Sequence, residues 1–173
     1  MGPLLSFCSC WLPKPLRSFQ IVHLRRFFIS PGHNYFGHHG KPAGTHPTTE
    51  VATLECVAGK GIRGDRFFAH KENYAGQITF FDFEVFTELC AHLSLGERSP
   101  ADLRRNVITN GVDLNTLIDE EFEIQGVRFL GTRECSPCYW MDQAYAPGTE
   151  AFLKGRGGLR AQILTSGTIR VKA

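Results

Sequence analysis

The feature that most constrains this fold is a series of short β-prone runs separated by turn residues. Valine, isoleucine, phenylalanine and threonine dominate these runs, and glycine, proline or Asn-Gly pairs separate them. The runs cover residues 20–30, 50–57, 77–81, 107–109, 122–124, 127–129, 159–164 and 168–171. Short strands at such close spacing indicate a mainly β protein built as a barrel. We expect the last two runs to form a hairpin that turns at Ser166 and Gly167.

Helices are expected to be few and short. Asp82 is a good N-cap for a helix over residues 83–93, one face of which is apolar: Phe83, Phe86, Cys90 and Leu93. This spacing predicts that Cys90 is a core thiol. A short turn starts at Ser99, and Thr149 is a candidate cap for a helix that ends near Leu153.

Composition and charge exclude several classes of protein. The chain has 173 residues, 42% of them hydrophobic and 21% charged, which suits one domain with a substantial core and an extension. The net charge of +2 argues against a nucleic-acid partner bound by phosphate neutralisation. No apolar run approaches the roughly 20 residues that a transmembrane helix needs.

The N-terminal part differs in charge from the rest. Residues 1–49 carry five basic residues and no acidic one. We expect residues 1–18 to be a poorly structured leader and residues 19–173 to form the domain. A mitochondrial transit peptide would have this composition, and upstream sequence before a later natural start is the alternative. We therefore expect a cytoplasmic protein, or a mitochondrial one if the leader is a transit peptide.

The chemistry is expected at Cys135-Ser136-Pro137-Cys138, which follows an alternating apolar run. Pro137 has no N–H and a fixed φ, so the chain should leave its strand here and present Cys138 on a turn. A thiol reacts and binds metals as the thiolate, which basic neighbours favour. Arg133 is close in sequence, and folding could bring other arginines to the same place: Arg104, Arg105 and Arg156. Half of a zinc site and a dithiol redox pair remain alternatives.

Two loops are candidates for the walls of a site. Residues 59–66 contain three glycines within six residues together with Lys60, Arg63 and Arg66, so backbone N–H groups and positive charge could meet an anion. A solvated turn is the alternative. Residues 31–42 contain three histidines without an acidic or thiol partner at ligand spacing, which favours a polar loop at a pocket rim over a metal site.

Four segments in order resemble the MOSC family, the domain found at the C-terminus of molybdenum cofactor sulfurases. They are Gly61-Ile62-Arg63-Gly64-Asp65-Arg66, the run from Arg104-Arg105-Asn106 to Leu114, Cys135-Ser136-Pro137-Cys138, and Gly157-Gly158-Leu159-Arg160-Ala161-Gln162-Ile163-Leu164. Each segment alone is a loose signal. The resemblance covers roughly residues 20–172 and implies a MOSC-like β-barrel that binds the molybdenum cofactor, molybdopterin with its metal.

The resemblance also implies roles for individual residues. Cys138 corresponds to the family's essential cysteine, so it is the expected catalytic residue and molybdenum ligand. The residues expected to bind the cofactor are Gly61, Arg63, Gly64, Asp65, Arg66, Arg104, Asn106 and Arg156. The residue types agree, because a thiolate suits a soft metal and arginine binds a phosphate through two parallel hydrogen bonds.

The expected function is that of a molybdenum-dependent oxidoreductase that reduces N-hydroxylated compounds. The substrate would be a small molecule, and electrons would come from a separate donor protein, because the sequence offers no flavin, haem or iron–sulfur motif. The alternative is a non-enzymatic carrier that holds a persulfide sulfur or the cofactor on Cys138. A third possibility is a β-barrel binding module without molybdenum.

Overall fold

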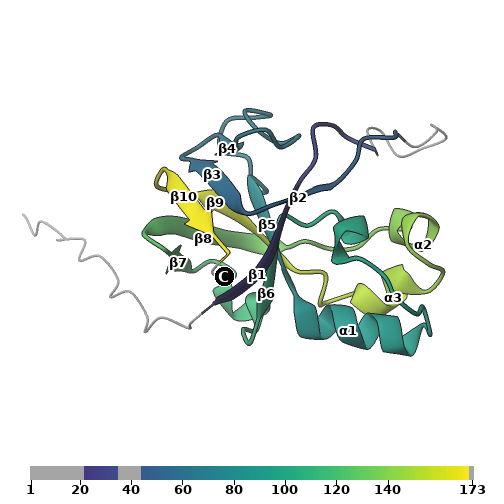
Figure 1. Cartoon of the computed structure of the whole chain (residues 1–173). Helices are drawn as coiled ribbons and strands as arrows, with labels where there is room; N and C mark the ends of the chain where they lie inside the picture. Colours follow the sequence, from purple (N-terminus) through teal and green to yellow (C-terminus); the bar gives the residue numbers. More distant parts are fainter. Residues whose placement is uncertain (1–21, 35–43, 172–173) are drawn as a thin grey trace, which may run out of the picture.

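The computed structural model describes residues 22–34 and 44–171, which fold into two β-sheets and a layer of helices (Figure 1). The strands are β1 (His23–Ile29), β2 (Thr49–Val51), β3 (Thr53–Val57), β4 (Gly61–Ile62), β5 (Ile78–Asp82), β6 (Val107–Asn110), β7 (Glu121–Ile124), β8 (Val127–Glu134), β9 (Leu159–Ile163) and β10 (Gly167–Arg170). The helices are α1 (Phe83–His92), α2 (Trp140–Ala144) and α3 (Thr149–Leu153), with 3-10 turns η1 (Pro100–Leu103) and η2 (Leu114–Leu117).

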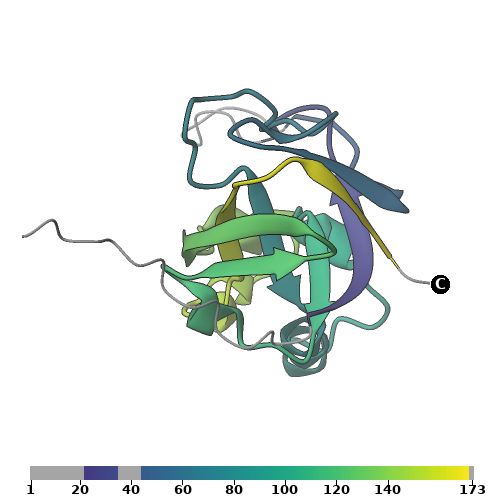
Figure 2. The same cartoon turned by 90° about the vertical axis from the view of Figure 1, so that its left-hand side faces the viewer.

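The larger sheet has seven strands in the order β2-β1-β6-β5-β9-β8-β7 and curls into a half-barrel. All its neighbouring strands are antiparallel except β5 and β6, which run parallel because α1 and η1 form the crossover between them. The smaller sheet, β10-β3-β4, lies across one side of the curled sheet (Figure 2). The expectation of a mainly β, barrel-like fold with a few short helices is confirmed.

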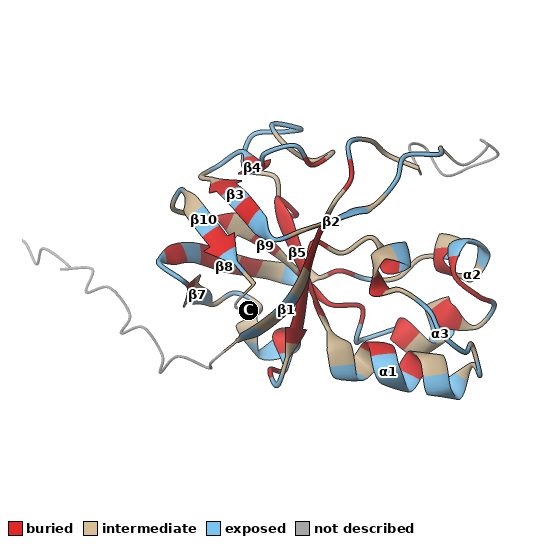
Figure 3. Ribbon diagram, viewed as in Figure 1, coloured by how far each residue is buried: buried red, intermediate tan, exposed pale blue. Residues whose placement is uncertain are grey.

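Neighbouring residues of the central strands face two different cores, because successive strand side chains point to opposite faces. Phe80 belongs to the core between the two sheets, with Leu54 and Ile169 of the smaller sheet. Phe81 belongs to the core under the helices, with Phe86 and Leu89. Burial is therefore nearly continuous along the central strands (Figure 3), and in β5 every residue from Ile78 to Phe81 is buried.

The helices cover the face of the large sheet that the small sheet leaves open (Figure 1). The Asp82 side chain accepts hydrogen bonds from the backbone N–H groups of Glu84 (2.8 Å) and Val85 (3.1 Å), which confirms it as the N-cap of α1. Ser99 caps η1 in the same way through Ala101. Thr149, the candidate cap, is instead the first residue of α3, and the N-cap of α3 is Gly148.

Several sequence expectations were wrong in detail. Strands β9 and β10 do not form a hairpin, because the turn at Ser166 carries the chain from the large sheet to the small one, where β10 pairs with β3. The run 50–57 is two strands, divided at Ala52 between the two sheets. Helix α2 follows Cys138 where a loop was expected. Cys90 is half-buried, 3.4 Å from the Tyr145 hydroxyl, rather than enclosed in the core.

The expected leader, including Cys8 and Cys10, lies outside the described residues. Within the described ranges, every helix is too short or too polar to cross a bilayer.

Candidate functional site

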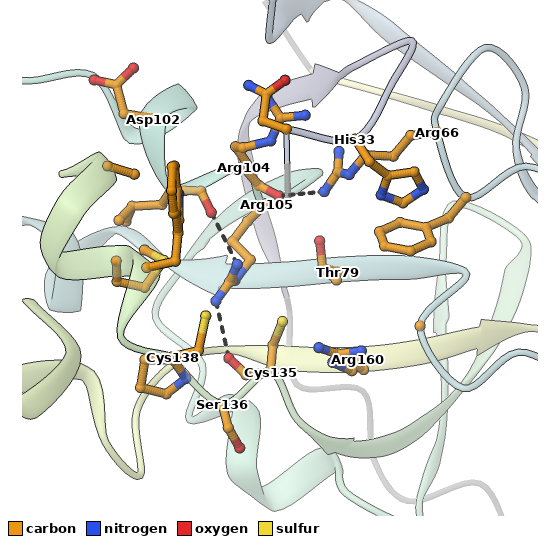
Figure 4. Close-up of a pocket in the computed structure, with 18 of the residues that line it drawn as sticks. His33, Arg66, Thr79, Asp102, Arg104, Arg105, Cys135, Ser136, Cys138 and Arg160 are labelled. Atoms are coloured by element: carbon orange, nitrogen blue, oxygen red, sulfur yellow. Dashed lines mark hydrogen bonds between the residues drawn. The ribbon is translucent and has the colours of Figure 1, made fainter. Parts of the chain in front are cut away.

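A cavity of about 450 Å³ opens where the ends of several strands meet the helical layer (Figure 4). Its walls come from the turn after β1, the loop between β4 and β5, the residues before β6, and the segment from the end of β8 to α2. The polar residues that line it include His33, Asn34, Arg66, His70, Tyr74, Thr79, Asp102, Arg104, Arg105, Cys135, Ser136, Cys138 and Arg160. Four arginines and one carboxylate give this cavity a positive lining.

Two thiols stand on one wall, in residues 135–138, which we term the thiol turn. Cys135 is only 4% exposed, and its backbone N–H donates to the Gly158 carbonyl at 2.6 Å. Cys138 is half-buried, and its carbonyl accepts the Met141 N–H at 2.8 Å, which starts helix α2. Both side chains point into the cavity (Figure 4). The thiol turn is thus fixed by backbone contacts on both sides.

Arg105 holds the thiol turn from the opposite wall. Its guanidinium donates to the carbonyl oxygens of Gly157 (3.2 Å), Leu103 (3.0 Å) and Cys135 (3.0 Å). The backbone of Gly157 lies so close to the thiol turn that a side chain would clash, because a Cβ there would lie 2.5 Å from the Cys135 carbonyl oxygen. The Gly157-Gly158 pair therefore does more than turn the chain: it lets β9 begin directly against the thiol turn.

Arg104 holds a different wall. Its guanidinium donates to the Gly32 carbonyl (2.8 Å), the Ser30 hydroxyl (2.8 Å) and the His46 carbonyl (3.1 Å). These contacts fix the turn that carries His33, residues 31–34, which we term the histidine turn. Two consecutive arginines thus hold two facing walls. Most of the Arg104 N–H groups donate hydrogen bonds to other groups of the protein.

A buried polar network supports the floor of the cavity. The Asp65 carboxylate accepts from the Ser30 N–H, the Phe67 N–H, the Asn106 amide and the Arg66 guanidinium at 3.1–3.3 Å. Burial lowers the pKa of Arg66 and outweighs the opposing effect of Asp65, whose carboxylate pairs with the guanidinium at 3.3 Å. Arg66 also donates to the Arg104 carbonyl at 3.0 Å. Asp65 and Asn106 lie beneath the cavity lining and act through their neighbours.

Arg160 faces the buried thiol. It is on β9, donates to the Tyr74 hydroxyl at 3.2 Å, and interacts electrostatically with the Cys135 side chain. Burial acts to lower the pKa of Arg160, but Cys135 and Tyr74 more than offset this and raise it. Since Arg66 also faces Cys135, two cations stand beside this sulfur. The arrangement favours an anion at this end of the cavity.

Aromatic rings form the remaining wall. Phe67 stacks on Tyr74 with ring centroids 5.1 Å apart, and His33 meets the Phe67 ring edge-on at 4.7 Å. His70 packs against Phe67 and Tyr74 at the exposed rim. This wall offers flat apolar surface beside the positive one.

The structure brings Cys138, Arg66 and Arg104 together in the cavity, but not the other expected residues. Arg63 is largely exposed and pairs with Glu55 at 2.8 Å. Arg156 pairs with Glu88 at 2.7 Å on a second cavity of about 430 Å³. Gly61 and Gly64 have positive φ and shape the chain before Asp65.

Sequence reasoning left out several lining residues: Phe67, His70, Tyr74 and Arg160. A signal existed for Arg160, because Arg160 and Gln162 alternate with the buried apolar residues of β9 and therefore point to its other face. His33 matches the expectation of a histidine loop at a pocket rim. His38 and His39 lie outside the described residues.

A metal site made by the protein alone finds no support in the described segments, where no three metal-ligating side chains of histidine, cysteine or carboxylate type gather. Cys135 and Cys138 are free thiols there, as are Cys56 and Cys90. A zinc site at the thiol turn would need a second ligand pair.

The chain is similar in fold to solved bacterial proteins. YuaD from Bacillus subtilis shares 19% identity at a TM-score of 0.66, with 87% of this chain and 91% of that chain covered. YiiM from Geobacillus stearothermophilus shares 13% identity at a TM-score of 0.63, with 88% of this chain and 72% of that chain covered. YiiM from Escherichia coli shares 15% identity at a TM-score of 0.59, with 86% of this chain and 67% of that chain covered. At these identities the likeness concerns the fold alone.

Sequence comparison gives the family. No curated protein is detectably similar to this chain along its sequence. The model of the MOSC domain matches residues 38–173, which include the thiol turn, both consecutive arginines and the Gly157-Gly158 pair. A match over most of the chain, together with the shared fold, shows that this protein belongs to the MOSC domain family.

Proposed function

We propose that the protein binds the molybdenum cofactor in the thiol-lined cavity and reduces small N-hydroxylated compounds. The observation that carries the proposal is the meeting of two thiols with four arginines around one cavity of about 450 Å³. That volume lies within the range of about 300–1,000 Å³ that is usual for ligand and cofactor sites.

The lining fits the chemistry of the proposed group. A thiolate is a soft ligand for a redox-active metal, and guanidinium groups bind phosphate. The flat wall of Phe67 and Tyr74 offers a surface for a planar pterin. Asp102 is the single carboxylate among the lining residues of this cavity in the described chain, so little negative charge opposes an anionic ligand.

Cys138 would hold the metal, because it is half-buried, lines the cavity and starts a helix that fixes its position. Arg66, Arg105 and Arg160 would face the anionic part of the cofactor. When bound, the cofactor supplies two-electron redox chemistry. The chain itself would orient the substrate, limit access of water and provide protons. Electrons would come from a separate donor protein, since the family resemblance and the sequence offer no second redox group here.

The half-exposed position of Cys138 also favours a second candidate, a carrier that holds a persulfide sulfur on this thiol for a partner. Both candidates need Cys138, but only the reductase turns over a substrate. The expected compartment is cytoplasmic, or mitochondrial if residues 1–18 are a transit peptide.

The test is elemental analysis and pterin fluorescence on protein made in a host that synthesises the molybdenum cofactor. We expect near-stoichiometric molybdenum in the natural chain and its loss in Cys138→Ala, with turnover of a benzamidoxime-type substrate by dithionite-reduced viologen. Cys90→Ala, outside the cavity, is the matched control and should keep its molybdenum. Protein without molybdenum or pterin would refute the proposal, and molybdenum retained in Cys138→Ala but lost in Cys135→Ala would move the ligand to Cys135.

A further inference from the structure

The histidine turn places a proton-exchanging side chain on the cavity wall that faces the thiols. Reduction of an N-hydroxylated compound to its amine takes two electrons and two protons, and one of the protons leaves with the oxygen as water. Among the described residues that line the cavity, histidine is the one side-chain type whose ordinary pKa is near neutral pH. Two of these described residues are histidines, His33 and His70.

We propose that His33 is the general acid that protonates the leaving hydroxyl group, and that His70 passes protons to it from solvent. This inference rests on the proposed reductase function and names the proton donor that the function lacks so far.

The position of His33 is fixed by the same arginine that the sequence assigned to the cofactor. Arg104 donates to the carbonyl of Gly32, the residue before His33, at 2.8 Å. The His33 ring contacts Phe67 edge-on, with ring centroids 4.7 Å apart. A side chain held by a clamped turn and a ring contact has the preorganisation that a general acid needs.

His70 connects this site to solvent. It is exposed at the rim, and its ring centroid lies 6.0 Å from that of His33. Phe67 packs against both histidine rings, and Tyr74 packs against His70. One histidine inside the cavity and one at its mouth give a short path for proton return.

The chemical balance of the step is simple. The N–O bond of R–NH–OH breaks, the oxygen takes a proton from the His33 imidazolium and leaves as water, and the nitrogen takes the electron pair and a second proton from solvent. Reduced viologen is the electron source in the assay and is oxidised. The His33 imidazole regains its proton through His70.

The charges around His33 predict the pH range of the effect. Partial burial lowers the pKa of His33, and Arg66 and His70 lower it further, while the Arg66 backbone and Asp65 offset part of this. A general acid must be protonated to act, so kcat should fall about tenfold per pH unit above an apparent pKa that lies below about 6.5.

The test compares His33→Asn with His92→Asn, an exposed histidine of α1, both loaded with cofactor. We expect His33→Asn to keep its molybdenum, to lose about 100-fold or more in kcat, to lose the pH-dependent limb, and to regain activity with added imidazole. His92→Asn should match the natural protein. In the cofactor-free chain, NMR titration should show the His33 pKa rising in His70→Asn, because a neighbouring cation is removed.

The outcomes separate the two proposals. Natural protein that binds molybdenum and turns over, with unchanged kcat and pH profile in His33→Asn, would overturn the role of His33 and leave the reductase standing. An activity loss without imidazole rescue and with an unaltered pH limb would show a merely structural role and also overturn it. A natural protein without molybdenum or turnover would overturn both.

Discussion

Replacement of Asn106 by alanine is the sharpest test of the site described here, because the family resemblance and the structure give this residue different roles. Its side-chain oxygen accepts from the Thr79 N–H (3.1 Å) and hydroxyl (2.8 Å), and its amide donates to the Phe28 carbonyl and the Asp65 carboxylate, both at 3.2 Å. Asn106 is 1% exposed. Its amide is therefore fully engaged within the protein.

The free-energy cost of Asn106→Ala follows from the buried polar groups that lose a hydrogen-bond partner. Asp65 keeps three other donors, and the Thr79 hydroxyl keeps the Asn106 backbone N–H. The Thr79 N–H and the Phe28 carbonyl lose these side-chain partners, and a buried unsatisfied group costs about 1–3 kcal/mol. We expect Asn106→Ala to lower the free energy of unfolding by about 3–5 kcal/mol, a large part of the roughly 5–15 kcal/mol typical of domains.

The assay is urea unfolding of cofactor-free protein, followed by circular dichroism. Asn115→Ala is the matched control, since that side chain is exposed and donates to the Gly155 carbonyl at 3.0 Å, so its change should stay below about 1 kcal/mol. A loss below about 1 kcal/mol for Asn106→Ala would refute the supporting role and return Asn106 to the cofactor. Loss of molybdenum with unchanged stability would point the same way.

Two further predictions concern the thiol turn and helix α1. Gly157→Ala should destabilise the protein by about 1–3 kcal/mol and lower molybdenum occupancy, because its Cβ would meet the Cys135 carbonyl at 2.5 Å. The control Gly155→Ala has open space around its Cβ, so it should cost about 1 kcal/mol from its positive φ and leave molybdenum occupancy unchanged. Equal effects of the two changes on unfolding and on metal content would contradict this. Burial, reinforced by the neighbouring Glu84 carboxyl group, raises the pKa of Asp82 to about 6. The folded state therefore holds a proton that the unfolded state releases near pH 4, so this contribution to stability is present below pH 4 and lost as the pH rises to 6. Asp82→Asn, which still caps α1, should flatten the urea midpoint over pH 4–6, and an unchanged slope would show that other groups cause it.

Local patterns predicted the elements of this fold well where neighbouring residues decide the conformation. Asp82 before an apolar helical face predicted α1, and the β-prone runs 122–124 and 127–129 predicted β7 and β8. The pairing of β10 with β3 could not be read in this way, because partners more than a hundred residues apart are chosen by burial between two sheets. The same apolar alternation would serve either pairing.

The site shows the same division. Pro137 after the β8 run placed a thiol at a strand end, as the local chemistry of proline requires. The sequence identified arginines as candidate site residues, but it did not show which groups each arginine contacts. Arg63 and Arg156 found carboxylates outside the cavity, while Arg160 reached it from a strand.

The mainly β class, the position of the thiol turn and the family can all be read from the amino-acid sequence. These properties follow from spacing, propensity and motif order, which depend on neighbouring residues. The contacts of the polar side chains depend on the folded arrangement instead: Arg104 holds the histidine turn, Arg105 holds the thiol turn, and Asn106 lies beneath the cavity lining. A long side chain selects its partner by distance and burial, and both are set when remote segments pack together.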